Sequence, residues 1–228
     1  MDAKRARRIR LLSYLAVALY SVIVVYLLSR TSAPLAYNLA RAAGLFGYGA
    51  LFVTILSHEY RREMRKLFGR PFVTVHHILA VTGLVLVILH PVLMAIFMRD
   101  PRQFVPRFDS LRTFLLLGGR PALYLILIAV LAAAVRPGGR RPNGVVRRRL
   151  KDTWRLIHWL NYVAFVLVFA HSWLLGRNVS SSMLKFVWPL MLVIVVVVFL
   201  RKRLVRTPPK RGAVRPGGQR PNGGVPEA

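Results

Sequence analysis

Residues 72–98 read FVTVHHILAVTGLVLVILHPVLMAIFM, and residues 154–176 read WRLIHWLNYVAFVLVFAHSWLLG. Each stretch is long and apolar enough to cross a lipid bilayer as one helix, which takes about 20 residues. Each also contains two histidines, which are His76 and His90 in the first stretch and His158 and His171 in the second. An imidazole is costly inside a membrane, so an intramembrane histidine indicates a functional site.

The composition is that of a membrane protein with strongly basic loops. Of the 228 residues, 55% are hydrophobic, while the formal net charge is +28 and is concentrated between the apolar blocks. These blocks lie at residues 11–28, 42–57, 72–98, 113–135, 156–175 and 186–200. We therefore expect an all-α fold, an integral membrane bundle of six transmembrane helices.

Short loops join the apolar blocks, which predicts one domain with basic ends. We expect a cytoplasmic segment at residues 1–10, the six-helix domain at residues 11–205, and a disordered basic tail at residues 206–228. The tail is rich in Pro, Gly and Arg, a composition that does not form a core. AVRPGGRRPNG at 134–144 nearly repeats as AVRPGGQRPNG at 213–223. Low-complexity drift explains this repeat more simply than a duplicated docking element.

Lys and Arg are most numerous before the first block and after the second, fourth and sixth. Such residues favour the cytoplasmic side of a membrane. We therefore expect a multi-pass protein of the cell membrane with both termini in the cytoplasm. Because topology accounts for the positive charge, we expect anionic lipids but no nucleic acid as partners.

The four histidines match in depth. His76 and His158 are each the fifth residue of the stretches quoted above, and His90 and His171 are the nineteenth and eighteenth. Both stretches cross the membrane in the same direction, so His76 pairs with His158 near the cytoplasmic face and His90 with His171 near the outer face. At ~1.5 Å per residue the two levels lie about 20 Å apart. Imidazole is a ligand of haem iron, so the pattern predicts two bis-histidine haem sites.

Helical phase decides between the neighbours His76 and His77. The fourteen residues from His76 to His90 fall about 40° short of four full turns, so these two share a face and His77 does not. We predict His76 as the ligand and a hydrogen bond to a neighbouring helix for His77. The thirteen residues from His158 to His171 leave about 140° between them, which requires a bent or overwound helix.

Haem propionates need cationic partners. Arg155 lies about one turn before His158 and is the best inner candidate, while Arg99 and Arg177 are weaker outer candidates. His58 is expected to be solvated at the membrane interface. The chain contains no cysteine, which excludes disulfides, cysteine-ligated iron–sulfur clusters and covalently attached c-type haem.

The pattern H-x13-H followed by H-x12-H resembles the ferric reductase-like transmembrane domain superfamily. This superfamily includes ferric reductases, NADPH oxidases and the haem subunits of bacterial methionine sulfoxide repair systems. The matching segments are TVHHILAVTGLVLVILHP, GGRPALYLILIAV and WRLIHWLNYVAFVLVFAHSWLLG, within roughly residues 10–205. The resemblance implies two b-type haems, on His76/His158 and His90/His171, with electrons moving outward.

We therefore expect a di-haem transmembrane electron-transfer protein, an oxidoreductase component without its own flavin and NADPH domain. Larger relatives continue into such domains, whereas this chain has no G-x-G-x-x-G motif and ends soon after its sixth block. The expected donor is a cytoplasmic flavin reductase or a membrane quinol, so flavin or quinone enters through a partner. The expected outer-face acceptor is ferric iron, dioxygen or a periplasmic enzyme.

Three other functions stay open. The chain fits the haem subunit of a periplasmic methionine sulfoxide repair system in its stand-alone form, although such subunits often lack the inner histidine that His76 supplies. A non-haem metal-binding or transport protein is the second alternative. Transport favours carboxylates near the middle of the membrane, and none of the seven acidic residues lies there. A non-catalytic scaffold with basic docking segments is the third.

Overall fold

The computed structural model describes residues 3–69, 72–134 and 144–204, and within these ranges it is all helical. The elements are α1 (Ala3–Ser29), α2 (Leu35–Glu59), α3 (Arg61–Phe68), α4 (Phe72–Met98), the 3-10 helix η1 (Pro101–Phe104), α5 (Leu111–Leu116), α6 (Gly119–Ala134), α7 (Gly144–Leu175), α8 (Arg177–Ser180) and α9 (Leu184–Leu204). The predicted tail and both copies of the near-repeat, except Ala134 and Gly144, lie outside the described residues.

The predicted membrane bundle is confirmed, but the number of spans is not. Among the described residues, α1, α2, α4 and α9 are long and apolar enough to cross a membrane, whereas α6 and α7 contain shorter apolar segments, Gly119–Ala132 and Trp159–Leu175. The block at 113–135 is not one helix, because it breaks at Leu117 and Gly118 into α5 and α6. Pro121 has no N–H to continue the helical ladder across this break.

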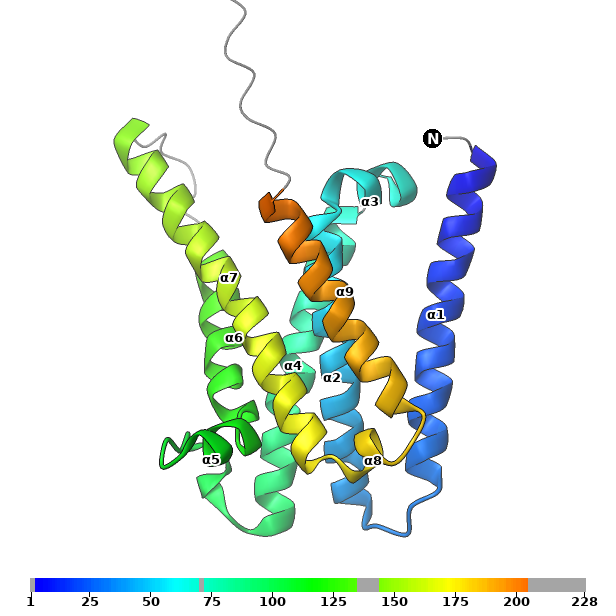
Figure 1. Cartoon of the computed structure of the whole chain (residues 1–228), viewed down its shortest axis with the longest axis vertical. Helices are drawn as coiled ribbons and strands as arrows, with labels where there is room; N and C mark the ends of the chain where they lie inside the picture. The colour runs from blue at the N-terminus through cyan, green and yellow to red at the C-terminus, as the bar shows by residue number, and fades with distance from the viewer. Residues whose placement is uncertain (1–2, 70–71, 135–143, 205–228) are drawn as a thin grey trace, which may run out of the picture.

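The helices form a bundle with two distinct ends (Figure 1). The start of α1, helix α3, the start of α7 and the end of α9 lie at one end, which we call the α3 end. The α1–α2 connection, η1, α5 and α8 lie at the opposite end, the α5 end. Helix α2 contacts α1, α4, α7 and α9, so it is the element against which the others are positioned.

An aromatic stack joins three helices in the core. The Tyr48 ring of α2 lies between Phe165 of α7 and Trp188 of α9, with ring centroids 4.6 Å and 4.5 Å away. The Trp188 indole N–H donates a hydrogen bond to Ser172 Oγ of α7 at 2.7 Å. Large rings that stack at this distance make extensive dispersion contacts, so α7 and α9 are held against α2.

Small residues bring α2 and α4 close together. A Cβ atom added at Gly47 of α2 would lie 3.1 Å from Val87 Cγ2 of α4, and one added at Gly83 of α4 would lie 3.2 Å from Ala50 Cβ of α2. Helices in lipid associate through such small-residue contacts, because lipid gives no hydrophobic drive for their association. The contact fixes the height of α4, and of its histidines, relative to α2.

We expect Gly83→Leu to destabilise this helix pair, because Ala50 Cβ cannot move away without moving the backbone of α2. Overpacking costs about 1–3 kcal/mol, so the midpoint of thermal unfolding in detergent, followed by circular dichroism, should fall. The control is Val85→Leu on the same helix, at a side chain that is 55% exposed. Equal midpoints for the two variants would contradict the close contact.

Candidate functional site

The two partly buried histidines of α4 both form hydrogen bonds with α2. His90 Nδ1 lies 2.8 Å from the backbone oxygen of Ala40, and His76 Nδ1 lies 2.7 Å from Ser57 Oγ. The shared partner helix agrees with the helical phase, which places His76 and His90 on one face. His77 is exposed instead, as its phase predicts, although no hydrogen bond from its ring to a neighbouring helix is observed among the described contacts.

These hydrogen bonds determine which ring nitrogen carries the proton. A carbonyl oxygen only accepts, so the bond to Ala40 requires His90 to be protonated at Nδ1. The Ser57 hydroxyl also lies 2.9 Å from the Thr54 backbone oxygen, and when it donates its one proton there, it accepts from His76 Nδ1. In the neutral form each Nε2 therefore carries a free lone pair, the form in which imidazole binds a metal.

His171 of α7 is held in the same way by a different acceptor. Its Nδ1 lies 2.6 Å from the backbone oxygen of Leu116, which is the last residue of α5. The final carbonyls of a helix have no intrahelical donor, so the break between α5 and α6 makes this oxygen available. His171 is thus also protonated at Nδ1, with its Nε2 lone pair free.

His90 and His171 come together near the α5 end of the bundle. Their ring centroids lie 6.4 Å apart, and the ring planes are 74° from each other. Two imidazoles on opposite sides of one metal, with each nitrogen about 2 Å from it, have ring centroids about 6–6.5 Å apart. The two rings that the sequence pairs at the outer level are therefore neighbours, at a spacing that suits a shared metal, while the metal site itself stays a prediction.

Two glycines make room for these two rings. A Cβ atom at Gly44 of α2 would lie 2.9 Å from His90 Nδ1, and one at Gly119 of α6 would lie 3.0 Å from His171 Cδ2. Gly44 follows Ala40 by one helical turn, so its missing side chain also leaves the Ala40 carbonyl open to His90. That carbonyl has a second lone pair to offer beyond its helical hydrogen bond.

At the other level the structure describes one side of the predicted pair. His158 belongs to α7, but its side chain, like that of Arg155, lies outside the described residues. Three other rings lie near His76, with centroids 6.4 Å away at His58, 6.3 Å at Phe72 and 5.9 Å at His77. The pairing of His76 with His158 therefore stays a prediction.

His58, expected to be solvated or interfacial, is partly buried against His76 near the end of α2, so it is not fully solvated. It also lines a small opening between α2 and α7, together with Leu51, Thr54, Ile55, Asn161 and Tyr162. Beside this opening, the Tyr162 hydroxyl donates to Glu59 Oε1. Lys202 Nζ of α9 donates to the backbone oxygen of Glu59 at 2.7 Å. This polar end of α2 lies at the level of His76.

A family model described as the ferric reductase like transmembrane component matches residues 16–169, more than half of the 228-residue chain. The chain belongs to the ferric reductase-like transmembrane family. No curated protein and no solved structure matches the chain. The matched segment includes His76, His90 and His158 and ends two residues before His171. Family membership indicates transmembrane electron transfer and agrees with the resemblance of the histidine pattern.

For a member of this family, the sequence pattern identified the histidines but not the groups that orient them. Ser57, the hydrogen-bond partner of His76, is only 3% exposed. A serine inside an apolar span was the one sequence feature that could have indicated this partner. Gly44 and Gly119 lie among other small residues of the kind that pack helices together. The sequence therefore did not distinguish these two glycines from glycines that only pack helices. The acceptors for His90 and His171 are backbone atoms, which sequence does not mark.

Arg99 and Trp159 both lie at the surface of the bundle. Arg99 is exposed at the end of α4, where its backbone adopts a φ of 52°. Trp159 is 40% exposed, and its ring packs edge-on against Phe199 with centroids 5.9 Å apart. The side chain of Arg177 lies outside the described residues.

We expect His76, His90 and His171 to be protonated at Nδ1 and not at Nε2, because each Nδ1 faces an acceptor on a neighbouring element. ¹⁵N NMR of histidine-labelled protein from iron-limited cells measures this directly. His77, whose ring is exposed, is the internal control and should not share the preference. Protonation at Nε2 of His90 or His171 would contradict the acceptor geometry.

Proposed function

We propose that the protein is a di-haem transmembrane electron-transfer protein, with haem b at an outer level on His90 and His171 and at an inner level on His76 and His158. The observation that carries the proposal is the His90–His171 pair. Its ring centroids are 6.4 Å apart, and both Nδ1 atoms are occupied by backbone carbonyls. Both Nε2 lone pairs are therefore available to one iron.

Haem fits this donor set better than a bare ion does. Within the described ranges, no group of three or more His, Cys, Asp or Glu side chains is close enough to hold a metal ion. A bare transition metal needs about four or more protein or water ligands, whereas a porphyrin brings the remaining ligands itself.

When bound, haem b supplies a one-electron redox centre at each level. The residues of the chain would orient it and adjust its affinity for electrons. The carbonyls of Ala40 and Leu116 hold the two imidazoles in one tautomer, and a hydrogen bond at Nδ1 makes the ligating nitrogen more basic. The apolar side chains of the bundle exclude water, which restricts the sites to electron transfer.

The inner site rests on His76, which Ser57 holds with its Nε2 free. His158 is its proposed partner, because α7 places it thirteen residues before His171 on the same helix. Arg155 is the proposed partner of the inner propionates. His58 lies as close to His76 as His171 does to His90, so it must be tested beside His158.

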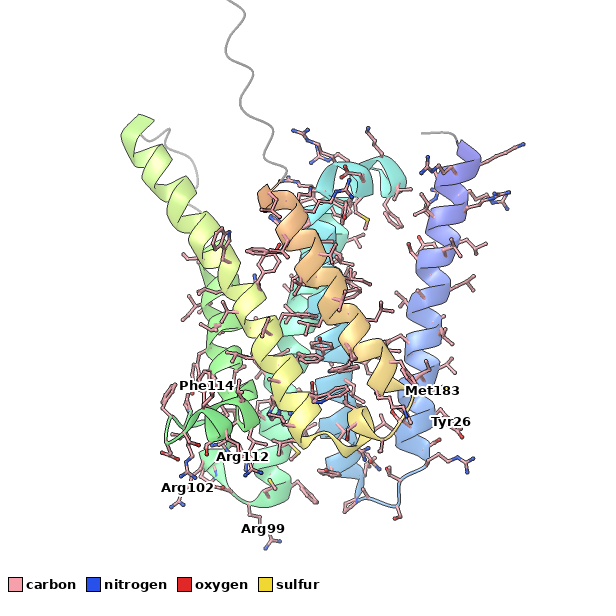
Figure 2. All side chains as sticks on the ribbon, in the orientation of Figure 1. Tyr26, Arg99, Arg102, Arg112, Phe114 and Met183 are labelled. Atoms are coloured by element: carbon pink, nitrogen blue, oxygen red, sulfur yellow. The ribbon has the colours of Figure 1, made fainter. Side chains whose placement is uncertain are left out.

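We propose that the α3 end faces the cytoplasm, because the basic segments that favour that side gather there. Its α3 helix carries Arg61, Arg62, Arg65 and Lys66. The donor proposed for this end is a flavin reductase or a membrane quinol. At the α5 end, Figure 2 shows Arg99, Arg102 and Arg112 around η1 and α5. The proposed acceptor at this end is ferric iron, dioxygen or a periplasmic enzyme.

Purified protein should contain about two low-spin b haems per chain, since two bis-histidine levels are proposed. We expect His90→Ala and His171→Ala each to remove the same haem and to leave the other. The pyridine haemochrome assay gives the stoichiometry, and the redox titration of the visible spectrum shows which haem is lost.

His77→Ala and His58→Ala are the matched controls and should keep both haems, whereas His76→Ala and His158→Ala should each lose the inner one. Folded wild-type protein without haem would overturn the proposed function. Retention of the inner haem in His158→Ala together with its loss in His58→Ala would replace His158 by His58 at the inner site.

Gly44→Ala should weaken the outer haem, because the new Cβ would lie 2.9 Å from His90 Nδ1 and displace the ring from the Ala40 carbonyl. Loss of such a supporting hydrogen bond typically lowers metal affinity about 10–100-fold. Haem loss to apomyoglobin measures the change.

Gly49→Ala is the control, because its Cβ would lie 2.9 Å from Tyr20 Cε1. It introduces a clash of the same size on the same helix, but against α1 and away from the histidines. Equal haem loss from the two variants would mean that general loosening of the bundle, and not the position of His90, determines haem retention.

A further inference from the structure

Arg41 of α2 has a buried nitrogen without a partner. Its Nη2 atom and the Tyr48 hydroxyl are the buried side-chain polar atoms in the described ranges that make no hydrogen bond. A guanidinium is always charged at neutral pH, and burying one of its N–H groups without an acceptor is strongly unfavourable. Such an atom therefore marks a position where a hydrogen-bond acceptor from outside the described residues can bind.

The rest of the Arg41 side chain is fixed in place. Its Nη1 donates to Asn38 Oδ1 at 3.2 Å and to Thr31 Oγ1 at 3.4 Å. Its Cζ lies 5.4 Å from the centre of the Tyr37 ring. These contacts hold the guanidinium group through Nη1 and the face of the Tyr37 ring. Nη2 is therefore fixed in position but makes no hydrogen bond.

Arg41 lies beside the outer histidine level. It directly follows Ala40, whose carbonyl binds His90, and it precedes Gly44, which makes room for the His90 ring, by three residues. Residues three or four apart lie on one side of a helix. The same turn of α2 therefore supplies the acceptor for His90, the space for its ring and a buried positive charge.

The ligand that fits this position is a carboxylate. Within the described ranges, the only ion pair joins Arg107 to Asp109, and the other acidic side chain at the α5 end, Asp100, caps η1 by accepting from the Arg102 backbone N–H. Neither is paired with Arg41. Guanidinium groups bind carboxylates strongly and with defined geometry.

We propose that Arg41 binds a propionate carboxylate of the outer haem through Nη2, an inference that rests on the proposed function. Two other cations of the described ranges near this level are engaged or exposed. Arg120 donates to the Val105 backbone oxygen at 2.8 Å and to Gln103 Oε1 at 3.2 Å, and Arg30 is exposed and donates to the Tyr26 hydroxyl at 3.2 Å. Arg41 is therefore proposed beside Arg99 and Arg177, the propionate partners that the sequence suggests at this face.

The test compares Arg41→Gln with Arg41→Lys and with the control Arg30→Gln, which removes an exposed charge from the same end. Arg41→Gln should lower the midpoint potential of the outer haem, because a nearby positive charge stabilises the reduced form. It should also weaken retention of that haem about tenfold, the worth of one charge-assisted hydrogen bond. Arg41→Lys should restore part of both effects, and Arg30→Gln should change neither.

A second arm identifies the group that Arg41 binds. Wild-type protein reconstituted with iron protoporphyrin IX dimethyl ester, which has no propionate charge, should lose the outer porphyrin about as readily as Arg41→Gln loses haem b. Its midpoint potential should rise instead of fall, because the ester removes negative charge and leaves the positive charge of Arg41. Arg41→Gln should then cause little further change in retention of the ester, because coupled partners are non-additive. This arm and Arg41→Lys decide the question even if Arg41→Gln does not fold.

An equal effect of Arg41→Gln on retention of either porphyrin would overturn the proposal and point to a lipid phosphate as the partner of Arg41. Two haems with unchanged potential and retention in Arg41→Gln would overturn it as well, while leaving the proposed function intact. Folded wild-type protein without any haem would overturn the proposed function and this inference together.

Discussion

The site depends on one constraint, which is that an imidazole inside a bilayer must find its hydrogen-bond partner within the protein. Water is not available there, and an unsatisfied polar group costs several kcal/mol (about 2–7). For His90 and His171 the partner is a backbone carbonyl, and for His76 it is the Ser57 hydroxyl. Each of these partners fixes a tautomer, so satisfying the constraint also prepares the opposite nitrogen for a metal.

A helical carbonyl can accept from a neighbouring ring where its helix ends or where no side chain covers it. Leu116 offers its carbonyl because α5 ends there, and Ala40 offers a second lone pair because Gly44 has no side chain to cover it. Glycine therefore has two functions in this bundle. It lets α2 and α4 approach closely, and it exposes main-chain oxygen to a ring that would otherwise meet a Cβ atom.

The sequence predicted the elements that depend on a repeating pattern. The long apolar blocks predicted the helical bundle, and the spacing of His76 and His90 predicted their common face. The break in the block at 113–135 and the partly buried position of His58 depend on contacts between helices distant in sequence, which one-dimensional patterns do not encode. The same holds for Arg41. Its sequence position suggests an interface anchor, and only the three-dimensional contacts show that Nη2 is buried.

Helix α2 determines how far apart the two histidine levels lie along the bundle. It contributes neither His90 nor His76, yet Ala40 and Ser57 on this helix set the height at which each is held. Seventeen residues separate these two contacts, and each inserted residue would move one of them by ~1.5 Å and turn it by ~100°. Side chains along α2 can therefore vary, and the electronic properties of each level can vary with them. The length of the helix between the two contacts cannot change.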